Sequence, residues 1–143
     1  MLDRAAIAAL IPHQGRMCLL DAALAWDAAS IRCRSGAHRD PANPLRRDGR
    51  LAGVCTVELG LQAMALHGAL AAGGPQPAGM VTSLRDVVVA VASADELPDP
   101  LTIEARLLAG EARGYAYRFA VTAAGRPVCA GEATVFIPAG AAP

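Results

Sequence analysis

Apolar and polar positions follow two different periods along this chain. From residue 53 to residue 72 nearly every position is apolar or small. Apolar side chains recur there at three- and four-residue spacing: Val54, Val57, Leu61, Met64 and Ala65. This spacing predicts one helix, from about 54 to 72, that is hydrophobic on almost every side. Such a helix is wrapped by its fold or inserted in a membrane, and an embedded Glu58 would be costly in lipid, so we expect a wrapped core helix.

The remaining segments predict strands and turns. Asp3 is placed to cap a short helix that ends near Leu10. Apolar runs or period-two alternation predict strands at 17–26, 30–35, 80–92, 101–107, 115–121 and 128–137. Turn-forming residues lie between the later strands at 95–100, 110–114 and 123–126, and the last two strands are expected to pair as a hairpin. A long polar loop, 37–51, precedes the core helix, and loops of this length are uncommon unless they serve a function.

This order of elements favours one α+β domain over residues 1–143. Two strands, one long helix and a closing four-strand meander predict an antiparallel sheet wrapped around the helix. A single curled sheet leaves an edge strand, which a second subunit could extend. We therefore expect a two-fold dimer.

Composition and charge narrow the class of protein. Apolar residues make up 54% of the chain and charged residues 18%, which suggests apolar surface buried between subunits. Thirteen basic residues balance thirteen acidic ones, so we expect no nucleic acid or membrane partner. Four scattered cysteines lack a C-x-x-C pair and predict free thiols in the cytoplasm, with no metal site: Cys18, Cys33, Cys55 and Cys129.

Two segments resemble the FabZ-type 3-hydroxyacyl-acyl carrier protein dehydratases, which have the hot-dog fold. IPHQGRMCLLD (11–21) resembles their PH-R-x-P-x-L-L-V-D opening, and GVCTVELGLQAMA (53–65) resembles their G-V-L-I-L-E-A-M-A-Q-A helix. More narrowly, HRDPANPLRRDGRLAGVCTVE (38–58) resembles the ApeP-type dehydratase-like proteins of aryl-polyene gene clusters. The resemblance implies an antiparallel sheet around a central helix, no cofactor, and an acyl carrier protein as partner.

The resemblance also implies roles for particular residues. A loop histidine acts as the base, and here the candidate is His38. Glu58, in an apolar helix, is expected to have a raised pKa and to act as the acid, with Gln62 orienting it. The backbone amide of Gly53 could donate to the thioester oxygen. In the family the histidine and the glutamate come from different subunits.

The sequence departs from the family at the catalytic loop. FabZ-type enzymes carry their histidine in a G-H-F-P-G segment fourteen residues before the glutamate, where this chain has Pro44. His38 therefore depends on a longer loop to reach Glu58, and His13 is the alternative base. We expect His67, half a turn around the helix from Glu58, to be a core or interface residue.

Alternatives remain open for the loop and for the function. Arginines concentrate before the helix and are either ordinary surface charge or a dock for an acidic carrier protein and its phosphopantetheine phosphate: Arg39, Arg46, Arg47 and Arg50. The protein is a 3-hydroxyacyl-acyl carrier protein dehydratase, a hot-dog thioesterase, or a non-catalytic partner subunit. The dimer is formed with a second copy or with a related hot-dog subunit.

Overall fold

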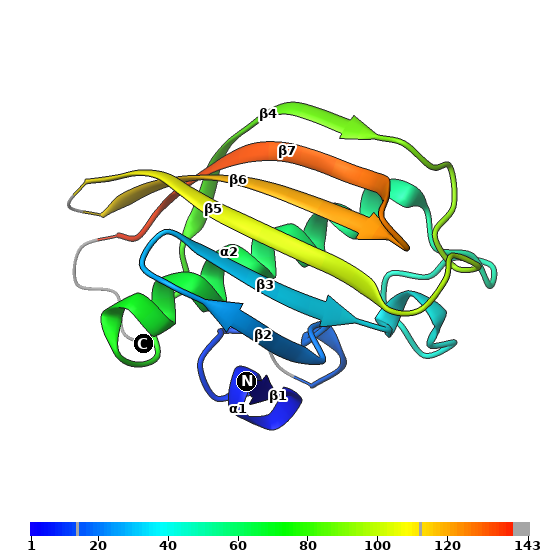
Figure 1. Cartoon of the computed structure of the whole chain (residues 1–143), viewed down its shortest axis with the longest axis horizontal. Coiled ribbons are helices and arrows are strands. Elements are labelled where there is room, and N and C mark those ends of the chain that lie inside the picture. Colours follow the sequence, from blue (N-terminus) through cyan, green and yellow to red (C-terminus); the bar gives the residue numbers. More distant parts are fainter. Residues whose placement is uncertain (14, 112, 139–143) are drawn as a thin grey trace.

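The computed structural model describes residues 1–13, 15–111 and 113–138. Within them, a seven-stranded antiparallel sheet curls around one long helix (Figure 1). The elements are β1 (Leu2–Asp3), α1 (Arg4–Ala8), β2 (Ala22–Trp26), β3 (Ser30–Ser35), α2 (Val57–Ala72), β4 (Met80–Val89), β5 (Leu101–Glu111), β6 (Gly114–Ala123) and β7 (Arg126–Phe136). Short 3-10 helices span Gly15–Met17, Ala37–Arg39 and Gly53–Thr56. The α+β hot-dog arrangement is confirmed.

The core helix α2 follows directly on the 3-10 turn Gly53–Thr56. It ends because Gly73 takes a left-handed conformation, with φ 83°, and the amide of Gly74 bonds to the carbonyl of Ala69. Every α2 residue before Ala71 is buried or half-buried, as the sequence pattern predicts. Gly53–Ala72 has the length and hydropathy of a membrane span, but a core helix has the same properties and the sheet covers this one.

Close packing of α2 against the sheet depends on Gly60. A Cβ atom at this position would lie 2.4 Å from the ring of Phe119 on β6. The absent side chain lets the helix approach the strand until the aromatic ring fills the space. The core therefore forms directly between the inner face of the sheet and α2.

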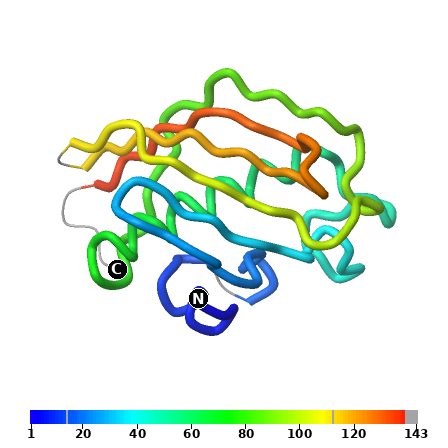
Figure 2. Tube along the Cα trace, viewed as in Figure 1, coloured from blue at the N-terminus to red at the C-terminus, as the bar shows by residue number. Residues whose placement is uncertain are grey.

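The strand order differs from the expected meander. The order is β1-β2-β3-β5-β6-β7-β4, so of the four closing strands β5, β6 and β7 form a meander and β4 does not precede β5 in it. β4 pairs with β7 at the edge, and the chain then crosses to β5, which pairs with β3 (Figure 2). The β3–β5 register places Cys33 opposite Ile103, and both side chains are fully buried. The four-strand meander is therefore wrong, although the predicted β6–β7 hairpin is confirmed.

Several predicted boundaries also move. Asp3 caps α1 through the amide of Ala6, as expected, but the helix ends at Ala8. The strand predicted from residue 17 begins at Ala22. Before it, the amide of Leu19 bonds to a helix side chain, not to a neighbouring strand. Residue 112, in the predicted turn 110–114, lies outside the described residues.

An apolar surface covers the edge strand β4. Its large apolar side chains are 37–63% exposed: Met80, Val81, Leu84, Val87, Val88 and Val89. We call these residues the β4 face. Among the described residues, no strand pairs with the outer side of β4. An apolar edge without a neighbouring strand is a surface that a second subunit could cover.

Candidate active site

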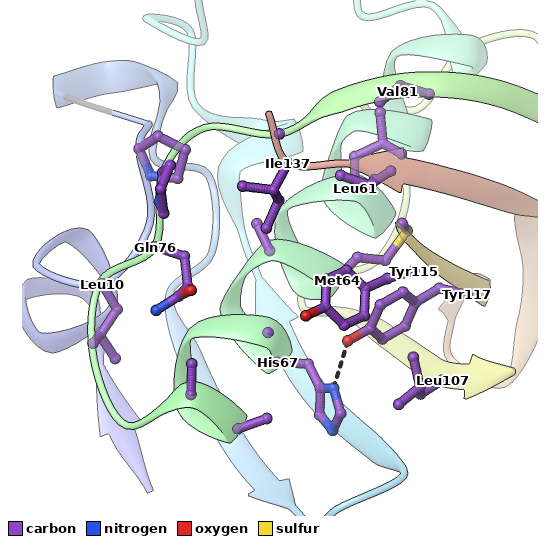
Figure 3. A pocket seen from close by; sticks show the side chains of 18 of the residues that line it. Leu10, Leu61, Met64, His67, Gln76, Val81, Leu107, Tyr115, Tyr117 and Ile137 are labelled. Atoms are coloured by element: carbon purple, nitrogen blue, oxygen red, sulfur yellow. Dashed lines mark hydrogen bonds between the residues drawn. The ribbon is translucent and has the colours of Figure 1, made fainter. Parts of the chain in front are cut away.

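A mostly apolar cavity of about 360 Å³ lies between α2, the strands β5–β7 and the segment after α2. The helix contributes one face to it: Glu58, Leu61, Met64, Ala65, His67, Gly68, Ala71 and Ala72. His13 lines it from the N-terminal segment. Gln76, from the segment after α2, and Val81, on β4, line it as well (Figure 3). A cavity of this size and lining is typical of a small-molecule site.

His13 and Glu58 form the polar pair of the cavity. His13 Nε2 lies 3.0 Å from Glu58 Oε1, and each side chain is 25% exposed. A carboxylate can only accept, so the ring nitrogen donates the hydrogen bond. The structure therefore selects His13, the alternative base of the sequence analysis, as the histidine that meets Glu58. Both residues come from one chain, not from two subunits.

Gln62 holds Glu58 in place and ties the helix to the N-terminal segment. Its side-chain amide donates to Glu58 Oε1 at 3.2 Å and to the carbonyl of Met17 at 2.6 Å. Its oxygen accepts from the amide of Leu19 at 2.9 Å. The side chain is fully buried. The contact predicted between Gln62 and Glu58 is confirmed, and the bonds to backbone explain why a helix so apolar contains a glutamine.

The expected raised pKa of Glu58 is wrong. Burial raises the pKa of this carboxyl, but the hydrogen bonds from His13 and Gln62 and the positive charge of His13 lower it by more, so the net pKa is below its ordinary value. Glu58 is therefore ionised at neutral pH. Both of its hydrogen bonds fall on Oε1, and among the described residues none engages Oε2.

His38 does not reach this site, so its expected pairing with Glu58 is wrong. The side chain is only 1% exposed, and Nε2 bonds to the carbonyl of Leu97 at 3.0 Å. It does not line the cavity. The side chain is therefore enclosed within its own chain.

The backbone amide of Gly53 is not free to bind a thioester oxygen. It already donates to the carbonyl of Ala92 at 2.9 Å. A Cβ atom on Gly53 would lie 1.9 Å from the carbonyl oxygen of Val91, so the glycine is required for this close approach. Its role is to join the start of the helix to the segment after β4.

The four loop arginines do not line the cavity. Arg46 is half-buried and bonds to the carbonyls of His38 and Gly49, so it holds the loop together. The other three are exposed, and two of them bond across to the segment after β4: Arg39 to the carbonyl of Leu97 and Arg50 to Ser93 Oγ. Carrier docking at these residues stays a prediction.

The far part of the cavity contains a second polar group that sequence reasoning missed. His67 Nδ1 lies 2.7 Å from the hydroxyl of Tyr117, and His67 Nε2 lies 2.9 Å from the carbonyl of Asp27. Both side chains are at least 96% buried, as expected for a core histidine. Period two along β6 could have placed Tyr115 and Tyr117 on one face, but nothing in the sequence connects them with His67.

No described group of three or more histidine, cysteine or acidic side chains could hold a metal ion. The four cysteines are free thiols, and three of them are buried. Burial raises the pKa of Cys33 to about 12, which leaves its thiol protonated and inert.

Comparison with solved structures supports the fold. The dehydratase heterocomplex ApeI:P from Xenorhabdus doucetiae aligns with a TM-score of 0.82 and 20% identity, over 94% of this chain and 91% of that chain. Thioesterase superfamily member 2 of zebrafish aligns at 0.63 and 16%, over 94% and 93%. A hypothetical thioesterase from Streptococcus pneumoniae, solved with coenzyme A, aligns at 0.60 and 17%, over 82% and 84%.

A comparison with curated proteins gives no significant match. Among protein families, the model described as ApeP-like, ApeP dehydratase, matches residues 5–142, nearly the whole chain. This match agrees with the hot-dog fold and with the ApeP-type resemblance of residues 38–58. The chain therefore belongs to the ApeP-like family of dehydratases.

Proposed function

We propose that this protein dehydrates 3-hydroxyacyl thioesters carried on an acyl carrier protein. The observation that supports this most is the His13–Glu58 pair at an apolar cavity, which joins proton-transfer groups to a space suited to an acyl chain. Membership of the ApeP-like family agrees with it. Biosynthesis of polyene-type chains in the cytoplasm is the setting we propose.

The reaction removes a proton from Cα and expels the 3-hydroxyl as water. Because the pKa of Glu58 is lowered, the carboxylate is the group ready to accept the Cα proton, and Oε2 is the oxygen without a hydrogen bond among the described residues. A His13 ring protonated on both nitrogens donates its Nε2 proton, which in the resting pair points at Glu58 Oε1, to the departing hydroxyl. Glu58 is left protonated and His13 neutral with Nε2 free, and transfer of the carboxyl proton from Glu58 to His13 Nε2, after the carboxyl group turns, restores the pair. These roles reverse the ones expected from the sequence.

A carrier protein would deliver the chain to this site. Arg39, Arg47 and Arg50 are exposed, and guanidinium groups suit both an acidic protein surface and a phosphopantetheine phosphate. We propose them as the docking residues, and we leave out Arg46 because its guanidinium is bonded within the loop.

A second hot-dog subunit would cover the β4 face. The edge strand offers unpaired backbone groups and apolar side chains together, and another edge strand satisfies both. The solved ApeI:P dehydratase, which aligns with this chain, is a heterocomplex. This favours a related subunit over a second copy as the partner. We propose a mixed dimer.

A non-catalytic role as partner subunit is the second candidate. The absence of a G-H-F-P-G segment and the enclosure of His38 both favour it. A thioesterase is the third candidate and has less support, because the two thioesterases compared above share 17% and 16% identity and show the fold alone.

One assay separates the three candidates. The chain is incubated, alone and with its proposed partner, with 3-hydroxyacyl pantetheine thioesters, and both enoyl product and free thiol are measured. Enoyl product that depends on this chain and is lost in Glu58→Gln supports the dehydratase. Free thiol without enoyl product would indicate a thioesterase. Enoyl product from the partner alone, unaffected by Glu58→Gln in the complex, would indicate a non-catalytic subunit.

A further inference from the structure

The far part of the cavity has a polar end that the proposed chemistry does not use. Glu58 and His67 are nine residues apart on α2, so they lie about 13–14 Å apart along the helix axis at ~1.5 Å per residue. Tyr117 and Tyr115 line the same cavity from β6. An acyl chain that reacts at Glu58 would therefore point its distal end toward these residues. Figure 3 shows His67, Tyr115 and Tyr117 together in this part of the cavity.

The hydrogen-bond directions in this group are fixed. The carbonyl of Asp27 can only accept, so His67 Nε2 carries the proton and donates to it. In the neutral ring Nδ1 must then accept, so the Tyr117 hydroxyl donates its only proton to His67. Burial, and to a smaller extent the neighbouring Tyr115, raise the pKa of Tyr117 to about 12, so the phenol keeps that proton. Toward the cavity, Tyr117 Oη can therefore only accept.

Tyr115 offers the complementary bond. It lies two residues before Tyr117 on β6, so both side chains point to the same face of the strand. Tyr115 is only half-buried, and no hydrogen bond from the described residues engages its hydroxyl. Its O–H is therefore available to donate. One acceptor and one donor thus belong to neighbouring side chains that line the same cavity.

From this arrangement we infer that Tyr117 and Tyr115 form a subsite for a hydroxyl group at the distal end of the acyl chain. A hydroxyl both donates and accepts, so it satisfies Tyr117 Oη and Tyr115 O–H together. A carboxylate has no proton to donate, and a methyl end would leave the tyrosine groups without partners. This inference rests on the proposed function for the nature of the chain, but the subsite itself can be tested by binding alone.

The test uses unreactive acyl pantetheine amides in pairs of equal length, ending in methyl or in hydroxyl, and measures their Kd for the full chain by calorimetry. We expect the hydroxyl end to bind about tenfold tighter at one chain length, the one that reaches β6, and not at shorter lengths, because only there does it make hydrogen bonds that a methyl end cannot. Tyr117→Phe and Tyr115→Phe should each reduce this preference while they retain binding of the methyl-ended ligand. If Tyr117→Phe does not fold, His67→Phe provides a second variant. It removes the acceptor of the Tyr117 proton, so the preference for the hydroxyl end should change in size.

Equal affinity for both ends at every length would overturn the subsite. So would a preference that survives in both tyrosine variants. The binding test needs no turnover, so it is independent of the proposed function. A protein that prefers the hydroxyl end but forms no enoyl product would contradict the proposed function and leave the subsite supported. A protein that forms enoyl product but binds both chain ends equally would support the proposed function and contradict the subsite.

Discussion

His13 Nε2 lies 3.0 Å from Glu58 Oε1, which joins the segment after α1 to the second residue of the core helix. The contact is made within one chain, so no second subunit is needed to bring the two side chains together. Gln62 fixes both sides of it, because the same side chain bonds to Glu58 and to the backbone on either side of Cys18. The pair is thus built into the fold, and its chemistry can be tested one residue at a time.

Replacement of His13 should separate the two candidate bases. We expect His13→Gln to reduce kcat for enoyl formation by roughly 10²–10⁴-fold, the usual contribution of a general acid or base. His38→Gln is the matched control: its activity should stay within a few-fold, while its Tm falls because the bond to the Leu97 carbonyl is lost. The opposite ranking of the two variants in kcat would restore His38 as the catalytic histidine.

Removal of the Glu58 charge should change stability in a pH-dependent way. A carboxyl whose pKa is lowered on folding adds stability above its unfolded pKa of about 4.3, and this stability is lost as pH falls through the lower folded value. The Tm difference between wild type and Glu58→Gln should therefore be constant near neutral pH and decline below about pH 4. Asp27, whose pKa is lowered by the backbone amide of Ala29, contributes equally to both proteins and cancels. A difference that instead grows toward low pH would mean a raised pKa.

The sequence was sufficient for most of the helices and strands and insufficient for the pairing of distant side chains. Periodicity placed the core helix and the strand Ser30–Ser35, because each buries one regular set of side chains. It could not show that β4 joins β7 at the edge, since a strand's period says nothing about its neighbour.

The site was predictable only where the partners are close in sequence. Glu58 and Gln62 are one helical turn apart, so their contact follows from the period of the helix. His13 meets Glu58 only through tertiary packing, and the choice of His38 followed a loop position in related enzymes. The pKa of Glu58 is lowered where a raised pKa was expected, because the shift depends on the hydrogen bond from His13, which the sequence did not predict.

Gln62 should be essential for stability as well as for activity. Gln62→Leu leaves the amide of Leu19 and the carbonyl of Met17 buried without partners, at a cost of about 1–3 kcal/mol each. We expect a lower free energy of unfolding in urea and a lower kcat, since Glu58 also loses a donor. Gln76→Leu is the control, because Gln76 lines the same cavity but bonds only to nearby backbone. Equal losses in both variants would contradict an anchoring role for Gln62.

Two glycines of α2 should respond in opposite directions to alanine. At Gly68 an added Cβ meets no atom within 4 Å, so Gly68→Ala should gain up to about 1 kcal/mol of helix propensity and raise Tm by roughly 2–4 °C. Gly60→Ala should lower Tm, because its Cβ would lie 2.4 Å from the Phe119 ring. A larger side chain in Gly68→Leu fills the far end of the cavity, next to His67, so the longest acyl substrates should lose kcat/KM and the shortest retain it. An unchanged chain-length profile would place the acyl chain elsewhere.

A charge on the β4 face should prevent assembly without unfolding the chain. Val88 is 63% exposed and lies on the edge strand, so Val88→Lys buries no charge in the isolated subunit but places one in the proposed interface. We expect light scattering after size exclusion to show loss of the dimer, with the circular dichroism spectrum preserved. Leu108→Lys, on β5 and 43% exposed, is the control for adding a charge at an exposed apolar position away from the edge strand. Because His13 and Glu58 belong to one chain, the dissociated variant should keep the Glu58-dependent pH profile of stability, and a dimer that survives Val88→Lys would place the interface on another surface.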